Sequence, residues 1–163
     1  MKVFICLFFF GIMFWSCQRE STGPVAFNAQ VEREKVSFVL EKYVIANEDQ
    51  KIEIIREIWA PFPDIVVIGT DLGEKLVGWP TIKRAYERQF KSFEETLISV
   101  HDQVIRINET GNTAWFSQIL NYNYIYQGKK YQHEGLRFTG VLVKHEGDWV
   151  MVQSHISKPG IPD

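Results

Sequence analysis

Three polar side chains that could do chemistry fall close together within residues 131–140: His133, Glu134 and Arg137. The guanidinium of Arg137 is a planar fork of donors that suits a carboxylate or a phenolate. A carboxylate such as that of Glu134 acts as a general base when it is withdrawn from water. On a strand, His133 and Arg137 share one side and Glu134 takes the other, unless a bulge intervenes. Two interpretations stay open. Arg137 and His133 bind a ligand in a cavity, or Arg137 lies outside, in solvent or at a dimer contact, with Glu134 as its ion-pair partner.

Aromatic side chains are the second group of candidates. Most of them, Tyr86 included, are expected in the core, because aromatic residues dominate buried area. A few near the mouth of a cavity could stack on a flat ligand, and we expect Tyr43, Trp59 and Tyr122 there, with Trp79 at the rim.

Composition and spacing exclude other classes of function. The chain has 163 residues, 45% hydrophobic and 23% charged, with a net charge of −2, which is typical of one globular domain. It has no basic cluster for nucleic acid. The histidines lack metal-ligand spacing, and phosphate-binding glycine loops and nucleophile motifs are absent. The sequence therefore predicts no metal, no cofactor and no nucleic-acid partner.

The N-terminus has the pattern of an export signal. Lys2 precedes an apolar run over residues 3–15. This run is shorter than the roughly 20 residues that span a bilayer, but it has the length of the apolar part of a secretory signal. We therefore predict a signal peptide over residues 1–16. The chain has two cysteines, Cys6 and Cys17, and Cys6 lies inside that segment. A mature chain beginning at Cys17 therefore cannot form an internal disulfide.

A cysteine directly after such a run resembles the signal of bacterial lipoproteins, in which the cysteine becomes the lipidated first residue. The resemblance implies that Cys17 is lipidated and that the protein is held in the bacterial cell envelope, on the periplasmic or surface side of a membrane. Residues 17–29 would then be a flexible tether. An ordinary secretory signal or an uncleaved anchor is the alternative, and soluble secretion of the chain would contradict lipidation.

Three helices and a meander of strands must position these side chains. Apolar stripes predict one helix from Ala29 to about Asn47, a short one ending before Pro61, and a third that starts near Pro80. Residues 65–68 and 74–77 read as short strands around a turn. Residues 96–108, 112–127, 129–144 and 149–157 read as four long strands joined by glycine-bearing turns, which favour antiparallel pairing. The segregation of helices and strands predicts the α+β class.

The long strands must bend to fit a domain of this size. Sixteen residues would extend about 50 Å if straight, and we expect Gly135 and Gly140 to be the bend sites. A bent sheet that wraps around three helices leaves an apolar hollow. Alternation predicts the two faces of the last strand. Val150, Val152, Ser154 and Ile156 share one face, and Trp149, Met151, Gln153 and His155 share the other.

The order of these motifs resembles the NTF2-like superfamily, and within it the SnoaL-like and ketosteroid-isomerase-like domains. The resemblance covers residues 31–158 and rests on five segments. They are Tyr43-Val44 to Ile52, Trp59-Ala60 with the strand to Gly69, Gly78-Trp79-Pro80-Thr81-Ile82, Glu134 through Gly140, and Gly147 through His155. It implies a cone of three N-terminal helices packed on a strongly curved, mostly antiparallel sheet, with a domain over 30–158 and a tail over 159–163.

The resemblance also implies that the face of the last strand with Val150 and Ser154 lies in the pocket, so that Trp149, Met151 and His155 face outward. It implies roles for single residues as well. In ketosteroid isomerases a tyrosine and a protonated aspartic acid bind an oxyanion while a second aspartate moves a proton. Tyr43 matches the tyrosine. The base position falls near Gly69, which has no carboxylate, so Asp71 is the nearest candidate. The remaining position falls on Glu134 or on Arg137, depending on the direction of counting, which predicts a bulge between them.

Three functions follow as hypotheses. The first is binding of a small amphipathic or aromatic ligand, oriented by Arg137 and Tyr43. The second is an isomerase, dehydratase or cyclase in which Glu134 or Asp71 is the base and Tyr43 donates a hydrogen bond. The third is an interaction module that forms a homodimer through the outer sheet face or contacts an envelope partner. The missing carboxylate at Gly69 favours the first or the third.

Overall fold

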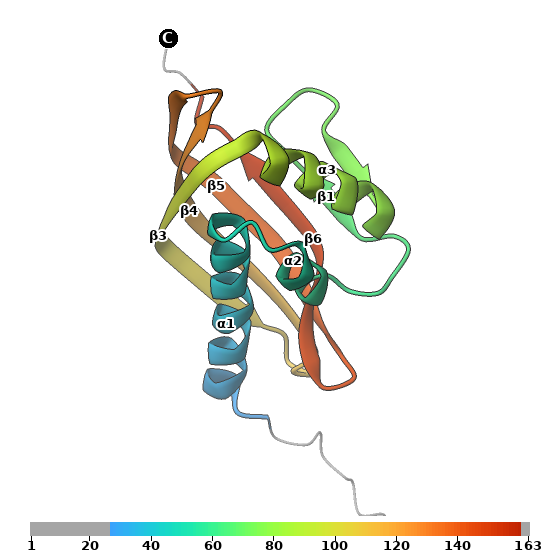
Figure 1. The fold of residues 1–163 in the computed structure, drawn as a ribbon. Coiled ribbons are helices and arrows are strands. Elements are labelled where there is room, and N and C mark those ends of the chain that lie inside the picture. The colour runs from blue at the N-terminus through green and yellow to red at the C-terminus, as the bar shows by residue number, and fades with distance from the viewer. Residues whose placement is uncertain (1–26, 161–163) are drawn as a thin grey trace, which may run out of the picture.

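The structure is a computed structural model that describes residues 27–160. These residues form three helices and six strands (Figure 1). The helices are α1 (Ala29–Glu48), α2 (Ile52–Ile58) and α3 (Trp79–Ser92). The strands are β1 (Val66–Ile68), β2 (Lys75–Val77), β3 (Phe93–Ile107), β4 (Thr113–Tyr126), β5 (Lys129–His145) and β6 (Asp148–Ser157). The predicted order of elements and the α+β class are confirmed.

The predictions for the N-terminus concern residues that the structure does not describe. The signal peptide, the lipidated Cys17 and most of the tether lie outside the described residues, and so does the end of the tail. No helix within residues 27–160 is both long and apolar enough to cross a membrane. Lipidation and location in the cell envelope therefore stay predictions.

The six strands form one mixed sheet in the order β2-β1-β6-β5-β4-β3. The pairing of β1 with β6 is parallel, and every other neighbouring pair in this sheet is antiparallel. Figure 1 shows α1, α2 and α3 on the same face of the sheet. The core lies between this face and the helices, and its helical part is a buried stripe on α1 formed by Val36, Leu40 and Tyr43.

A β-bulge at Gly135 sets the shape of the long hairpin formed by β4 and β5. Leu120 pairs with Leu136 and Tyr122 with His133, so two residues of β5 lie opposite Asn121 alone. Gly135 has a φ of +67°, in the region that side chains with a Cβ rarely adopt. Its N–H donates a hydrogen bond to Asn121 Oδ1 at 3.0 Å. The predicted bulge is confirmed, and Gly135 lies in it.

Gly140 lies at a close packing contact. A Cβ at this position would lie 2.7 Å from Phe116 Cε1 and 2.5 Å from the carbonyl oxygen of Gln153. The register shift between β5 and β6 lies beside it, between Val141 and Leu142. Gly140 is therefore the position at which the Phe116 ring closes onto the β5 backbone.

That register shift changes the predicted faces of β6. Leu142 pairs with Met151 and Val141 with Gln153, which leaves Val152 as the extra residue. Strict alternation fails across such a bulge. The expectation that Met151 and Trp149 face outward is therefore wrong, since they are 0% and 4% exposed.

The outer face of the sheet carries exposed apolar side chains. Leu97, Val104 and Trp115 are 65%, 46% and 49% exposed, and each neighbours a buried residue that points the other way. Such a patch suits a protein contact, although a homodimer through this face stays a prediction. A monomeric sedimentation coefficient at micromolar concentration would contradict it.

The buried carboxylate of Glu32 joins the start of α1 to strands β5 and β6 by hydrogen bonds. Glu32 is 7% exposed. Its Oε2 accepts hydrogen bonds from Trp149 Nε1 at 2.7 Å and from Lys144 Nζ at 2.8 Å, and its Oε1 accepts one from Lys35 Nζ at 3.1 Å. The hydrogen bond from Lys144 is the main reason that the pKa of Glu32 falls from 4.5 to about 2, and burial opposes this shift.

We expect Glu32→Gln to lower the free energy of unfolding at pH 7 by roughly 1.5–3 kcal/mol, the usual worth of a hydrogen bond to a charged group. Because the folded pKa lies below the unfolded value, the stabilisation is present above pH 4.5 and is lost as pH falls towards about 2. Urea unfolding at a series of pH values measures both effects. The exposed Glu34→Gln is the control, and equal losses in the two variants would contradict the assignment.

Candidate functional site

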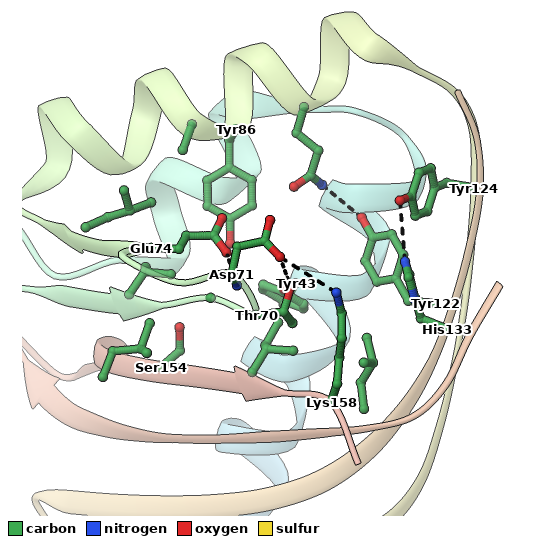
Figure 2. Close-up of a pocket in the computed structure, with 18 of the residues that line it drawn as sticks. Tyr43, Thr70, Asp71, Glu74, Tyr86, Tyr122, Tyr124, His133, Ser154 and Lys158 are labelled. Atoms are coloured by element: carbon green, nitrogen blue, oxygen red, sulfur yellow. Dashed lines mark hydrogen bonds and ion pairs between the residues drawn. The ribbon is translucent and has the colours of Figure 1, made fainter. Parts of the chain in front are cut away.

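A cavity of about 260 Å³ lies between the concave face of the sheet, α1, α3 and the β1–β2 hairpin. Wider depressions of about 720, 610 and 490 Å³ lie elsewhere on the surface. We select the first because the hydroxyl groups of buried tyrosines and two exposed carboxylates lie together around it. Figure 2 shows side chains from α1, α3, the β1–β2 hairpin and the sheet pointing towards one another across this cavity.

Three buried tyrosines line this cavity. Tyr43 of α1, Tyr86 of α3 and Tyr122 of β4 are 4%, 8% and 8% exposed. Burial raises the pKa of Tyr43 to about 12, and hydrogen bonds with Tyr86 and Asn47 oppose this shift only in part. Burial likewise raises the pKa of Tyr86 and that of Tyr122 well above the usual 10.0. At neutral pH all three are therefore neutral phenols that can donate a hydrogen bond.

An amide network holds Tyr122 in place. Its hydroxyl donates to Asn47 Oδ1 at 3.3 Å and accepts from Gln89 Nε2 at 2.8 Å. Asn47 is 1% exposed, and its Nδ2 donates to the carbonyl oxygen of Tyr43 at 2.8 Å. The sequence predicted that the first helix ends at about Asn47. In the structure Asn47 links α1, α3 and β4 beneath the cavity.

Two carboxylates lie at the mouth, on the β1–β2 hairpin. The carboxylate of Glu74 lies directly over Gly69, so a Cβ at position 69 would overlap it. Its Oε2 accepts a hydrogen bond from the Asp71 N–H at 3.3 Å. Asp71 is itself well exposed and lies 3.7 Å from Lys158 Nζ, as the dashed line in Figure 2 marks. The proximity of Glu74 is one of the causes that raise the pKa of Tyr43.

The structure brings four of the sequence-predicted site residues together in the cavity lining. They are Tyr43, Asp71, Tyr122 and His133. His133 Nε2 lies 3.4 Å from the hydroxyl of Tyr124, a neighbour on the same wall. The roles of these residues stay predictions.

Glu134 and Arg137 do not line the cavity, and the expectation that Arg137 lies inside it is wrong. Both side chains are exposed, whereas His133 and Leu136 point inward. The bulge at Gly135 is the reason, because it moves Leu136 onto the face of His133 and sends Arg137 to the outer one. No ion pair joins Glu134 and Arg137 within residues 27–160.

The two predicted tryptophans also lie elsewhere. Trp59 is 1% exposed beside Met151 in the core, and its Nε1 finds no hydrogen-bond partner in the described part of the chain. Trp79 begins α3, and its ring lies 5.0 Å from the guanidinium of Arg56. Neither lines the cavity.

Sequence reasoning missed Tyr86 and Glu74 as site residues. Tyr86 lies on the apolar stripe of α3, where a phenol hydroxyl needs a polar partner and so signals a polar point in the core. Glu74 is the hairpin partner of Gly69, since the Gly69 N–H donates to the Glu74 carbonyl oxygen at 2.9 Å. The pairing register of the hairpin, counted from its glycines, could have placed that carboxylate over Gly69.

Within residues 27–160 no group of three or more histidine, cysteine, aspartate or glutamate side chains is arranged to hold a metal ion. The arrangement instead offers neutral hydrogen-bond donors inside and a carboxylate at the mouth. Such a site can hold a small molecule by a polar oxygen, or assist a proton transfer on it.

The sequence profile described as "SnoaL-like domain" matches residues 36–162. Three solved structures show a similar fold. One is an NTF2-like superfamily protein from Salmonella enterica serovar Typhimurium LT2, with a TM-score of 0.74 and 16% identity over 82% of this chain and 95% of that chain. One is a candidate dehydratase of the NTF2-like family from Streptomyces avermitilis, with a TM-score of 0.70 and 17% identity over 82% and 100%. The third is an NTF2-like protein of unknown function from Pseudomonas putida KT2440, with a TM-score of 0.68 and 16% identity over 83% and 92%.

At these identities the likeness shows the fold alone, and the predicted NTF2-like fold is confirmed. No protein with a curated description matches the chain.

We expect Tyr43, Tyr86 and Tyr122 to stay protonated until the protein unfolds in alkali. Their folded pKa values lie above the unfolded value of 10.0, so stability is full below pH 10 and falls as pH rises through about 12, the value for Tyr43. Absorbance at 295 nm, followed together with circular dichroism, measures this. Tyr43→Phe should leave unchanged the number of tyrosines that ionise before unfolding, and a lower number would contradict its buried, neutral state.

Proposed function

We propose that this chain, which belongs to the SnoaL-like domain family of the NTF2-like superfamily, binds a small organic molecule in the cavity. The observation that carries this proposal is the convergence of three buried phenol hydroxyls on an apolar hollow of about 260 Å³. A cavity with apolar walls and a few fixed polar groups is the usual form of a small-molecule site. Its volume lies at the small end for such sites, which favours a ligand with one ring.

The orientation of the ligand follows from the placing of the polar groups. The inner end offers neutral hydroxyl donors, which suit a carbonyl or hydroxyl oxygen. The walls offer Phe93, Leu136 and Ile156, which suit a flat apolar body. Arg137 lies on the outer face and cannot bind a ligand in this cavity. The proposal therefore keeps Tyr43 and replaces the Arg137 anchor with the tyrosine cluster.

A cavity-filling substitution tests the proposal. Ala85 of α3 lines the cavity and neighbours the exposed Arg84. We expect 2-phenylethanol to bind the wild-type protein and Ala85→Leu to weaken it by about tenfold or more, because the added side chain occupies the volume of the ligand. Nuclear magnetic resonance titration measures both affinities.

The matched control is Arg84→Leu, which adds the same side chain outside the cavity and should bind like the wild type. Equal binding by Ala85→Leu and the wild type, or no binding of single-ring alcohols and ketones by the wild type, would contradict the proposal.

Proton-transfer catalysis is the second candidate function. The favouring observation is the Glu74 carboxylate, which occupies the space over Gly69 and lines the same cavity as Tyr43. In this arrangement Glu74 would take a proton from a carbon beside a carbonyl group, and Tyr43 would donate a hydrogen bond to the oxygen as it gains charge. The base is therefore Glu74 rather than Glu134.

Deuterium exchange tests this second candidate. We expect the wild type to speed the uptake of deuterium from D₂O into 2-tetralone, next to its carbonyl group. Glu74→Gln should slow the enzymatic rate by about 100-fold or more, the usual contribution of a general base. Glu134→Gln, which removes an exposed carboxylate outside the cavity, should keep the wild-type rate. No acceleration by the wild type, or equal rates in both variants, would contradict catalysis of this kind.

A further inference from the structure

The negatively charged side chains that line the cavity outnumber the positively charged ones. Among its lining residues in the described part of the chain, the charged side chains are Asp71, Glu74 and Lys158. Lys158 lies 3.7 Å from Asp71, so these two offset each other. Glu74 makes no ion pair within residues 27–160. The mouth therefore carries one carboxylate without a cationic partner.

The fold holds that carboxylate towards the cavity. The missing side chain of Gly69 leaves the space that it occupies, and the Asp71 N–H donates to it. Glu74 is one of the residues that line the cavity, and Figure 2 shows its side chain among the labelled residues there. A free side chain on a hairpin would lose conformational entropy when it bound a cation, whereas this one is already placed.

The walls behind the carboxylate are aromatic. Tyr86, Tyr122, Tyr124 and Phe93 line the cavity. Phe93 and Tyr131 stack on the Tyr124 ring at 3.9 and 5.2 Å, so Tyr86 and Tyr122 are the rings that can face a ligand. Aromatic faces carry negative potential and attract ammonium groups, most strongly where water is excluded. The hydroxyl oxygens of the tyrosines can in addition accept hydrogen bonds from an N–H donor.

The charges around this cavity are unfavourable for an anionic ligand. The guanidinium of Arg137, which would have received a carboxylate, lies on the outer face of β5. The Nζ of Lys158 is already paired with Asp71. An acid entering the cavity would therefore pass the unpaired Glu74 and meet neutral phenols and π faces.

We propose that the ligand of this cavity is a small organic cation, an amine or a quaternary ammonium compound with an apolar or single-ring body. Its cationic group lies beside Glu74 at the mouth, and its body lies between the aromatic walls. This inference rests on the proposed function, because it names the charge class of the molecule that the cavity holds.

A series of ligands with one shape and three charges tests the inference. The probes are 2-phenylethylammonium, 2-phenylethanol and phenylacetate, titrated at pH 7 and low ionic strength with nuclear magnetic resonance detection. We expect the ammonium compound to bind about fivefold or more tightly than the alcohol, and phenylacetate to bind more weakly than both. The advantage of the ammonium compound should shrink as salt is added, because Glu74 at the mouth is exposed.

Glu74→Gln isolates the charge. It should reduce the affinity for 2-phenylethylammonium to nearly that for the alcohol, while the affinity for 2-phenylethanol stays within about twofold, which shows that the cavity remains intact. The control Glu134→Gln makes the same change in net charge outside the cavity and should preserve the preference.

The outcomes separate this inference from the proposed function. If the three probes bind equally, if phenylacetate binds best, or if Glu74→Gln keeps the preference, the cation inference is overturned while binding in the cavity stands. If none of the probes binds the wild type, both the cation inference and the proposed binding function are contradicted.

Discussion

One backbone constraint decides what the cavity contains: the bulge in β5 at Gly135. A regular strand would have put His133 and Arg137 on the same face and given the cavity a guanidinium. The left-handed conformation of Gly135, secured by the hydrogen bond from its N–H to Asn121, inserts one residue and reverses the faces beyond it. His133 and Leu136 then both face the helices, and Arg137 faces out. A glycine thus sets the polarity of a site whose surface it hardly touches.

The inner wall depends on a different kind of constraint, the satisfaction of buried polar groups. Three phenol hydroxyls in one hollow would destabilise the fold if none had a partner. Asn47 and Gln89 supply partners for Tyr122, and Asn47 in turn is held by the backbone of α1. The hydroxyls of Tyr43 and Tyr86 lie close enough to shift each other's pKa. The result is a rigid set of neutral donors rather than a charged site.

Much of this arrangement could be predicted from the sequence, and the failures have physical causes. The stripe on α1 that carries Tyr43 and the glycine-bearing turns between the long strands follow from local patterns. The need for a bulge near Glu134 follows from the family resemblance, in which the two directions of counting disagree. The faces of Arg137 and Met151 do not, because a single inserted residue inverts every assignment after it and its position is not visible in alternation. Glu74 was missed for another reason. Its carboxylate matters only through the hairpin pairing that lays it over Gly69, which is a contact between residues rather than a property of either.

That contact ties the two hairpin positions to each other. A negative charge can reach the same point of the cavity from residue 69 or from residue 74, but not from both, because either side chain excludes the other. Substitutions at these positions are therefore epistatic. Any side chain at position 69 would have to displace Glu74, whereas a variant with a small residue at position 74 could accept aspartate at 69 and keep its charge. In related chains, the acidic residue of this hairpin should be found at either position 69 or position 74, the two ends of the loop between β1 and β2.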